Sequence, residues 1–440
     1  MKRFIFSLLT IVSFFLFSNI SNAQTGDSLL QQASLQACVQ YALTHQPVIR
    51  QSLIDEQITE RIIKGKLADW YPQINLDYNL QHYFKLPTTV FAGNRVTIGV
   101  KNTSFANFSL TQNIFDRDVL LASRSAGDVR KQVQQSTTNN KINVAVNVSK
   151  AFYDVLLNQQ QIRLLDSDIV LLEKSLNIAD NQYKAGVVDK VDYKRATITL
   201  NNAKAQRKTY QEQIKARYAY LKELMGYPSG GELNLVYDSV QMKQDAFIDT
   251  TQMINYESRI EYQLLLTQKR LQEDNLKYYK WAYIPEISAF GNYNLNFLNN
   301  EFGKLYNQNF PTSYTGLTLS FPIFQGTKRT QEIRQAQLEL ERVDYDIFAF
   351  KNSVNTQYQQ ALATYKSSLN NYNVLNENLA LAADVYNTIQ LQYKSGVKTY
   401  LDVIVSQNDL ISAQVNYLEA LYQVLSSKLD VQKALGQINY

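Results

Sequence analysis

The residues best suited to catalysis are few and lie far apart in this sequence. The only histidines are His45 and His82, and neither belongs to a His-Glu-x-x-His zinc motif. The chain also has no Gly-x-Ser-x-Gly nucleophile motif, no phosphate-binding glycine loop and no cluster of cysteine and histidine. We therefore expect no enzyme, no cofactor and no metal site. The acidic residues that remain are interpreted as members of solvated helix faces: Asp116, Asp118, Asp166 and Asp168.

The first residues predict an exported protein. Lys2 and Arg3 precede an apolar run over residues 4–17, and the small residues at 21–23 suit signal peptidase, so residues 1–23 are interpreted as a signal peptide. No later stretch approaches the roughly 18 apolar residues of a membrane-spanning helix, and we expect none in the mature chain. The only cysteine, Cys38, lies well past the cleavage site, so it can form neither an internal disulfide nor a lipid anchor.

Charge and composition favour a helical envelope protein. Removing Lys2 and Arg3 from the formal charge of +5 leaves +3, which is too small over this length to indicate a nucleic-acid partner. The 440 residues include only 7 Pro and 15 Gly, so long uninterrupted helices are favoured over a turn-rich fold.

An internal duplication is the most informative feature of the sequence. Four short segments return in the same order at offsets between 209 and 213 residues: Trp70–Pro72 as Tyr283–Pro285, Asn113–Phe115 as Pro322–Phe324, Gln182–Val187 as Gln392–Val397, and Leu224–Gly226 as Ala434–Gly436. We divide the chain after the signal peptide into a first repeat at 24–230, a linker at 231–250 and a second repeat at 251–440. Each repeat should contain a helix, two strands and a long helical hairpin, with tips near residues 186 and 396.

Four segments show the alternation of a half-buried strand. They lie near residues 74–81, 106–111, 287–297 and 317–321. A tilted strand of roughly ten residues is long enough to cross a bilayer. The apolar set should face lipid: Ile74, Leu76, Tyr78, Leu80, Tyr293 and Leu295. The polar set should face water: Asn75, Asn79, Asn292 and Asn294. The polar connections at 85–103 and 298–312 should form surface loops.

The helical segments keep a coiled-coil spacing. A helix is expected from about Leu35 to Asp69, and apolar or small residues alternate three and four apart over 162–183 and 193–224, and again 210 residues later. Arg207 and Arg217 fall on these seams, and we expect their charged ends to reach toward water. The path from 117 to 183 would extend roughly 100 Å if helical.

These elements predict an oligomer. Four strands cannot close a barrel, and an open sheet edge in hydrocarbon leaves backbone groups unpaired. Two copies would leave an almost filled eight-stranded barrel, whereas three copies would give twelve strands and room for a channel. All long helices should project from one side of the sheet.

The duplicated unit resembles the TolC family of outer-membrane efflux proteins. The resemblance rests on the Tyr-x-x-Gly tips at Tyr183 and Tyr393, the aspartates six residues after each tip glycine, and the closing Gly226 and Gly436. It implies an α+β membrane protein: a homotrimer with a shared twelve-stranded barrel in outer membrane lipids, continued by a periplasmic coiled-coil tunnel. It also implies an exit duct for efflux or type I secretion, docked to a periplasmic adaptor (membrane fusion protein) and an inner-membrane transporter of RND or ABC type. The alternative is an adaptor-like coiled-coil protein, which would need neither two hairpins nor four strands.

The resemblance also implies a periplasmic gate at the helix tips, beside the turns at Gly186 and Gly396. Positions matching Asp192, Tyr393 and Lys398 link neighbouring coiled coils in the family and hold the entrance closed. Lys398 stands where the best-known relative has arginine, so the link should be weaker. Asp402 matches the first of two entrance aspartates, whereas Val405 replaces the second. The alternative is that Asp192 and Asp402 only cap helix starts after the glycine turns.

Overall fold

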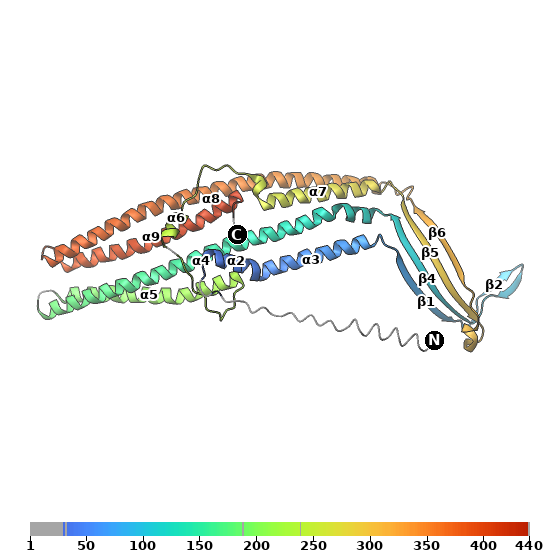
Figure 1. Cartoon of the computed structure of the whole chain (residues 1–440), viewed down its shortest axis with the longest axis horizontal. Helices are drawn as coiled ribbons and strands as arrows, with labels where there is room; N and C mark the ends of the chain where they lie inside the picture. The colour runs from blue at the N-terminus through green and yellow to red at the C-terminus, as the bar shows by residue number, and fades with distance from the viewer. Residues whose placement is uncertain (1–29, 31–32, 187–188, 238, 439–440) are drawn as a thin grey trace.

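A computed structural model describes residues 30, 33–186, 189–237 and 239–438. The predicted signal peptide lies outside these residues. Two long helical hairpins lie side by side, and a four-stranded sheet continues from one end of the helical layer (Figure 1). The hairpins are α4 (Arg117–Lys184) with α5 (Lys190–Met225), and α8 (Lys328–Lys394) with α9 (Tyr400–Leu435).

The four long helices follow directly from their sequences. None contains proline, and Asp116 starts α4 by accepting hydrogen bonds from the backbone N–H groups of Asp118 and Val119 at 2.8 and 3.0 Å. With 68 residues, α4 confirms the expected continuous path of roughly 100 Å. Asp116 is therefore a helix cap and not simply a residue of a solvated face.

The shorter helices complete each repeat. The helix expected from Leu35 to Asp69 is broken into α2 (Leu35–His45) and α3 (Pro47–Ala68). Gln46 adopts extended backbone angles because the residue before a proline is driven out of the helical region. In the second repeat, the 3-10 turn η1 (Tyr256–Ser258) precedes α7 (Ile260–Trp281). Contacts place the helices next to the sheet in the order α3, α4, α7, α8.

The sheet joins the two repeats. Its order is β1 (Gln73–His82), β4 (Asn102–Phe115), β5 (Glu286–Asn299) and β6 (Thr312–Ser320), and every pair is antiparallel. The four predicted strands are thus present, and β1 and β6 are the two open edges. The connection after β5 contains η2 (Phe302–Asn307). The connection after β1, predicted as a loop, instead forms a separate ribbon of β2 (Thr88–Phe91) and β3 (Asn94–Thr97).

The main core lies midway along the helices, where α2, α6 (Ser239–Asp245) and the segments around α6 pack against the two hairpins. Its fully buried members include Phe152, Leu221 and Tyr365. Tyr365 donates its hydroxyl proton to the Ala246 carbonyl at 3.0 Å, so the linker is held by α8. None of the helices in the described ranges is both long enough and apolar enough to cross a membrane.

Both hairpins end in the same kind of junction. Gly226 and Gly436 close α5 and α9 with φ angles of 65° and 70°, in the left-handed region that favours glycine. A Cβ on Gly226 would lie 2.7 Å from the His45 carbonyl oxygen, and one on Gly436 would lie 2.8 Å from the Ser258 Oγ and 2.9 Å from its carbonyl oxygen. Each repeat therefore packs its final glycine against the chain just before its own α3 or α7.

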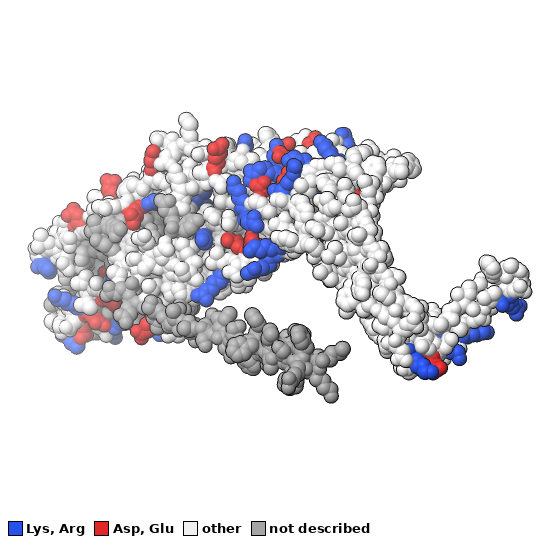
Figure 2. All heavy atoms as spheres, turned by 45° about the vertical axis from the view of Figure 1, so that its right-hand side comes forward, with Lys and Arg blue, Asp and Glu red and all other residues white. Residues whose placement is uncertain are grey.

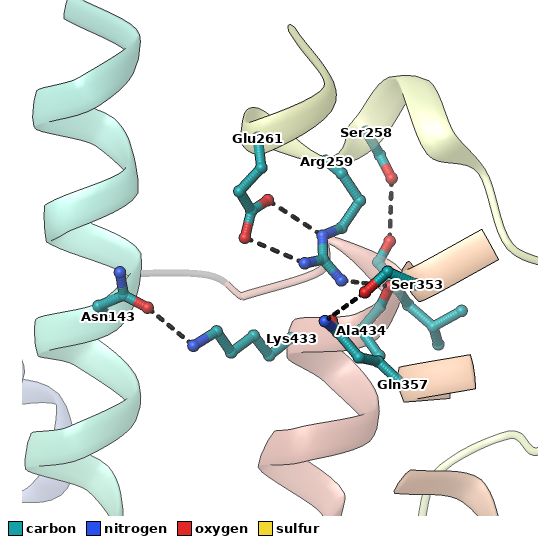
Figure 3. A network of polar contacts seen from close by, with 9 residues as sticks. Asn143, Ser258, Arg259, Glu261, Ser353, Gln357, Lys433 and Ala434 are labelled. Carbon is teal, nitrogen blue, oxygen red and sulfur yellow. Dashed lines mark hydrogen bonds and ion pairs between the residues drawn. The ribbon is translucent and has the colours of Figure 1, made fainter. Parts of the chain in front are cut away.

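A polar network holds the second junction (Figure 3). Arg259, which is only 5% exposed, donates from Nη1 to the Ala434 carbonyl at 3.0 Å, while its other nitrogens bind Glu261. Ser258 Oγ donates to the Leu435 carbonyl at 2.9 Å. These bonds satisfy carbonyls that the end of a helix leaves unpaired.

We predict that Gly436→Ala destabilises the protein by about 2 kcal/mol or more, because alanine is strained at this φ and its Cβ meets Ser258. Gly127→Ala is the matched control: it lies within α4 with open space around it, and it should be neutral or stabilising by up to about 1 kcal/mol. Denaturant unfolding of the purified protein measures both changes. Equal stability of the two variants would contradict the proposed junction.

Candidate functional site at the helix tips

The four predicted gate residues lie at the end of the helices that is far from the sheet, where both hairpins turn (Figure 1). Gly186 and Gly396 have φ angles of 73° and 76°, as expected for glycines that end a helix. After Gly396, the backbone N–H of Val397 donates to the Gln392 carbonyl at 2.9 Å and closes the turn. Residues 187–188 of the other turn lie outside the described residues.

Two tyrosines join the second hairpin to the first. The Tyr393 hydroxyl donates to Oε1 of Gln182 on α4 at 2.5 Å, and the Tyr400 hydroxyl donates to the Ser175 carbonyl at 3.2 Å. The two tyrosine rings contact each other with centroids 5.8 Å apart. Tyr400 also packs in a small buried cluster of α4, α5 and α9 residues: Ala179, Ala196 and Ile404. These contacts hold the tips of the two hairpins together within one chain.

Asp402 has a local role in this structure. It forms a capping box with Thr399, whose backbone N–H and hydroxyl donate to the Asp402 carboxylate at 2.9 and 2.8 Å. The backbone and side chain of Thr399, with a smaller contribution from the charge of Lys398, lower the pKa of Asp402. The ionised carboxylate is therefore favoured, and it accepts the hydrogen bonds of Thr399 at the start of α9.

Asp192 and Lys398 are placed differently from Tyr393. Asp192 lies in the first turn of α5, next to the N-cap residue Asp189. Burial raises the pKa of the Tyr400 hydroxyl, and the charges of Tyr393 and Asp192 act in the same direction, so Asp192 lies within electrostatic reach of the tyrosine pair. Within the described ranges, Lys398 is exposed and forms no ion pair with Asp192.

Gln182, Ser175 and Tyr400 also belong to this site, although they were not predicted from the sequence. Gln182 and Ser175 carry no signal of their own, because their role is to accept hydrogen bonds from another helix. The seam did not indicate Tyr400 either, because the alternation of three and four continues from Val403 four residues back to Thr399.

Farther from the tips, the two helices of each hairpin are held together by different kinds of contact in the two repeats. Arg207 and Arg217 of α5 form ion pairs with Asp166 and Asp154 of α4, so these arginines have specific partners and do not simply reach toward water as expected. The position of the second repeat that matches Arg207 is Tyr417, whose ring packs 5.5 Å from that of Tyr372.

Asp168 corrects the interpretation of the acidic residues. It is only 6% exposed, and its Oδ2 atom has no hydrogen-bond partner among the described residues. Asp168 lies about two helical turns after Gln161 on α4, and Gln161 donates to Glu419 of α9 at 3.4 Å. Burial raises the pKa of Asp168 to about 6, and the Asp168 charge adds to the burial that raises the pKa of Tyr386 on α8. This carboxylate is therefore a weak point between the hairpins.

We predict that Asp168→Asn stabilises the protein at pH 8 by up to about 3 kcal/mol. The folded-state pKa lies above the ordinary value of 3.8, so the folded state binds the proton more tightly and loses stability as pH rises from about 4 to 6. The gain should be complete above this window and absent near pH 4. Urea unfolding at both pH values tests it, with the exposed Asp384→Asn on α8 as control. A gain that does not change with pH would contradict the assignment.

Comparisons with known proteins agree with this architecture. A family model described as outer membrane efflux protein matches residues 38–227 and 262–437. The chain is 22% identical over 437 residues to outer membrane protein TolC of Escherichia coli, across 94% of this chain and 84% of that protein. It is 19% identical over 315 residues to the probable efflux pump outer membrane protein TtgC of Pseudomonas putida, across 69% of this chain and 62% of the relative.

Solved structures show the same fold. The chain superimposes on CusC with a TM-score of 0.74 at 14% identity, across 91% of both chains. It superimposes on the outer membrane protein VceC of Vibrio cholerae with a TM-score of 0.73 at 12% identity, across 91% of this chain and 96% of VceC.

Proposed function

The chain belongs to the outer membrane efflux protein family, and we propose that three copies form one continuous duct through the outer membrane and the periplasm. The protein is an outer-membrane efflux channel with a periplasmic helical portion. One observation carries the proposal: both long hairpins leave the same end of a single sheet whose two outer strands are unpaired. An adaptor-like protein would need neither the sheet nor the second hairpin.

Open edges on both sides of the protein support closure by further copies. The β1 and β6 edges expose backbone groups that hydrocarbon cannot satisfy. The outermost helices next to them, α3 and α8, each carry an exposed apolar stripe: Ile54, Ile58 and Ile62 on α3, and Leu338, Tyr345 and Phe348 on α8. Pairing β1 of one copy with β6 of the next brings these two helices together. Three copies then give twelve strands, which leave a channel.

The sheet register supports the proposed lipid-facing side. Leu76, Phe108 and Tyr293 are direct cross-strand neighbours, as are Tyr78, Ala106 and Leu295. Because directly opposed residues share a face, the whole apolar set lies on one face. Asn75, Ser109 and Asn292 form a corresponding row on the other face. We propose that the first face contacts lipid and the second lines the channel.

Cysteine scanning tests the orientation and the assembly together. With Cys38 replaced by alanine, a membrane-impermeant thiol reagent should label cysteines at Asn75 and Asn292 in intact membranes and leave those at Leu76 and Tyr293 unlabelled. Native mass measurement of the same protein should give three copies. The reverse labelling pattern would refute the orientation, and a homogeneous monomer or tetramer would refute the trimer.

The relatives support partners in the periplasm and inner membrane. TtgC is named as part of an efflux pump, and a duct without an energy source needs a transporter. We therefore assign docking to a periplasmic adaptor and, through it, to an inner-membrane transporter of RND or ABC type. The tips of the hairpins are the part of the chain farthest from the sheet, so they are the surface nearest to such partners.

The tips also form the proposed gate. Tyr393 and Tyr400 hold the two hairpins together by single hydrogen bonds to α4, which are weak enough to exchange when the hairpins separate. We assign Asp192 and Lys398 to contacts between neighbouring copies, because both are placed at the tips and form no ion pair with each other among the described residues. Asp402 should contribute one carboxylate per subunit, and Val405 none.

We predict that Asp192→Ala combined with Lys398→Ala increases the conductance and open probability in planar bilayers, because the entrance loses its charged contacts. Lys394→Ala is the matched control, since Lys394 is an exposed tip lysine on α8. If the double variant behaves like the parent, Asp192 serves only the start of α5 and the latch is refuted. Asp402 is left unchanged because its removal would also uncap α9.

A further inference from the structure

The β2–β3 ribbon projects from the far end of the sheet, away from the helices (Figure 1). Its turn places Ala92 and Gly93 at φ angles of 49° and 83°, as in the tight two-residue turns that favour hairpins. At its base, the Tyr83 N–H donates to the Lys101 carbonyl at 2.7 Å, and the Lys101 N–H donates to Asn300 Oδ1 at 3.1 Å. The ribbon is therefore anchored to the outer end of the sheet.

No other described element covers this ribbon. Phe84 is 95% exposed, Phe91 75% and Val90 68%, and all eight residues of β2 and β3 are exposed. An isolated two-stranded hairpin is only marginally stable in water. Phe91 and Val96 share one face of the ribbon, and Val90 lies opposite Arg95 on the other face, so both faces expose apolar groups of the kind that mark an interaction surface. The exposed ribbon therefore has the features of a surface that binds a partner.

The charge of the ribbon indicates what that partner is. Residues 83–101 contain Lys85, Arg95 and Lys101 and no acidic residue. Figure 2 shows basic side chains along this projection. Within the described parts of the chain, none of the three forms an ion pair with Asp or Glu. Ribbons from neighbouring copies would bring like charges together without compensation, which opposes direct pairing between them.

We propose that the β2–β3 ribbon binds an anionic phosphorylated lipid of the outer leaflet. The proposal rests on the proposed function, which places the outer end of the sheet at the membrane surface. Phe84, Val90 and Phe91 enter the boundary between acyl chains and headgroups, and Lys85, Arg95 and Lys101 pair with lipid phosphates. Surfaces that combine basic and aromatic residues bind anionic lipid in this way.

The test uses the full-length trimer in nanodiscs, with Cys38→Ala and an environment-sensitive fluorophore on Thr89→Cys, whose side chain shares a face with Val96. Discs contain phosphatidylethanolamine with increasing fractions of bis-phosphorylated lipid A, or of dephosphorylated lipid A. The emission should shift to the blue only with the phosphorylated lipid. Replacing Lys85, Arg95 and Lys101 by Gln should raise the half-maximal lipid fraction by about tenfold or more.

A control variant removes the same charge elsewhere: Lys208→Gln, Lys215→Gln and Lys366→Gln on the helices. It should respond like the parent. Equal shifts with dephosphorylated lipid A would overturn the proposal in favour of purely apolar insertion, and disulfides between Thr89→Cys ribbons before labelling would overturn it in favour of a second copy. Failure to form trimers in any disc would instead refute the proposed function, so the two failures are distinguishable.

Discussion

The unpaired backbone of β1 and β6 is the constraint on which the rest of the structure depends. A sheet whose edges are open cannot lie in hydrocarbon, because each unpaired group costs several kcal/mol. The helical layer follows the sheet, with α3 and α8 at its two sides and an exposed apolar stripe on each. In the assembly that we propose, the same contact between copies pairs the strand edges and covers both helix stripes, so that the membrane and periplasmic parts close together.

The duplication explains why both repeats have the same order of elements, and divergence between the repeats explains why different contacts hold their hairpins. Both repeats end in a left-handed glycine packed against the start of their own shorter helices. The first hairpin is then held by two arginine–aspartate pairs, whereas the second carries tyrosines at its seam and against the linker. A charged pair holds two helices at one position, while tyrosines combine apolar packing with a hydrogen bond that can exchange.

Several polar groups lie at the contact between the two hairpins. They include the buried Asp168, whose Oδ2 atom has no hydrogen-bond partner among the described residues, the Gln161–Glu419 bond and the two tyrosine bonds at the tips. Polar groups at such a seam stabilise little, and those left unpaired oppose packing. In the gate that we propose at this end, a seam of this kind serves opening, because its single hydrogen bonds can exchange when the hairpins separate.

The sequence by itself determined the duplication, the four strands, the long hairpins and the faces of the sheet, because these follow from local periodicity and from turn residues such as Gly186 and Gly396. It missed the break at Pro47 and the β2–β3 ribbon, where one residue or a short turn overrides a broader pattern. Only the tertiary structure decided the surroundings of the side chains. It shows that Asp168 is buried, that Arg207 forms an ion pair with Asp166, and that Asp402 accepts hydrogen bonds from Thr399. Periodicity fixes which face of a helix a residue occupies, but the neighbour on that face comes from another part of the chain.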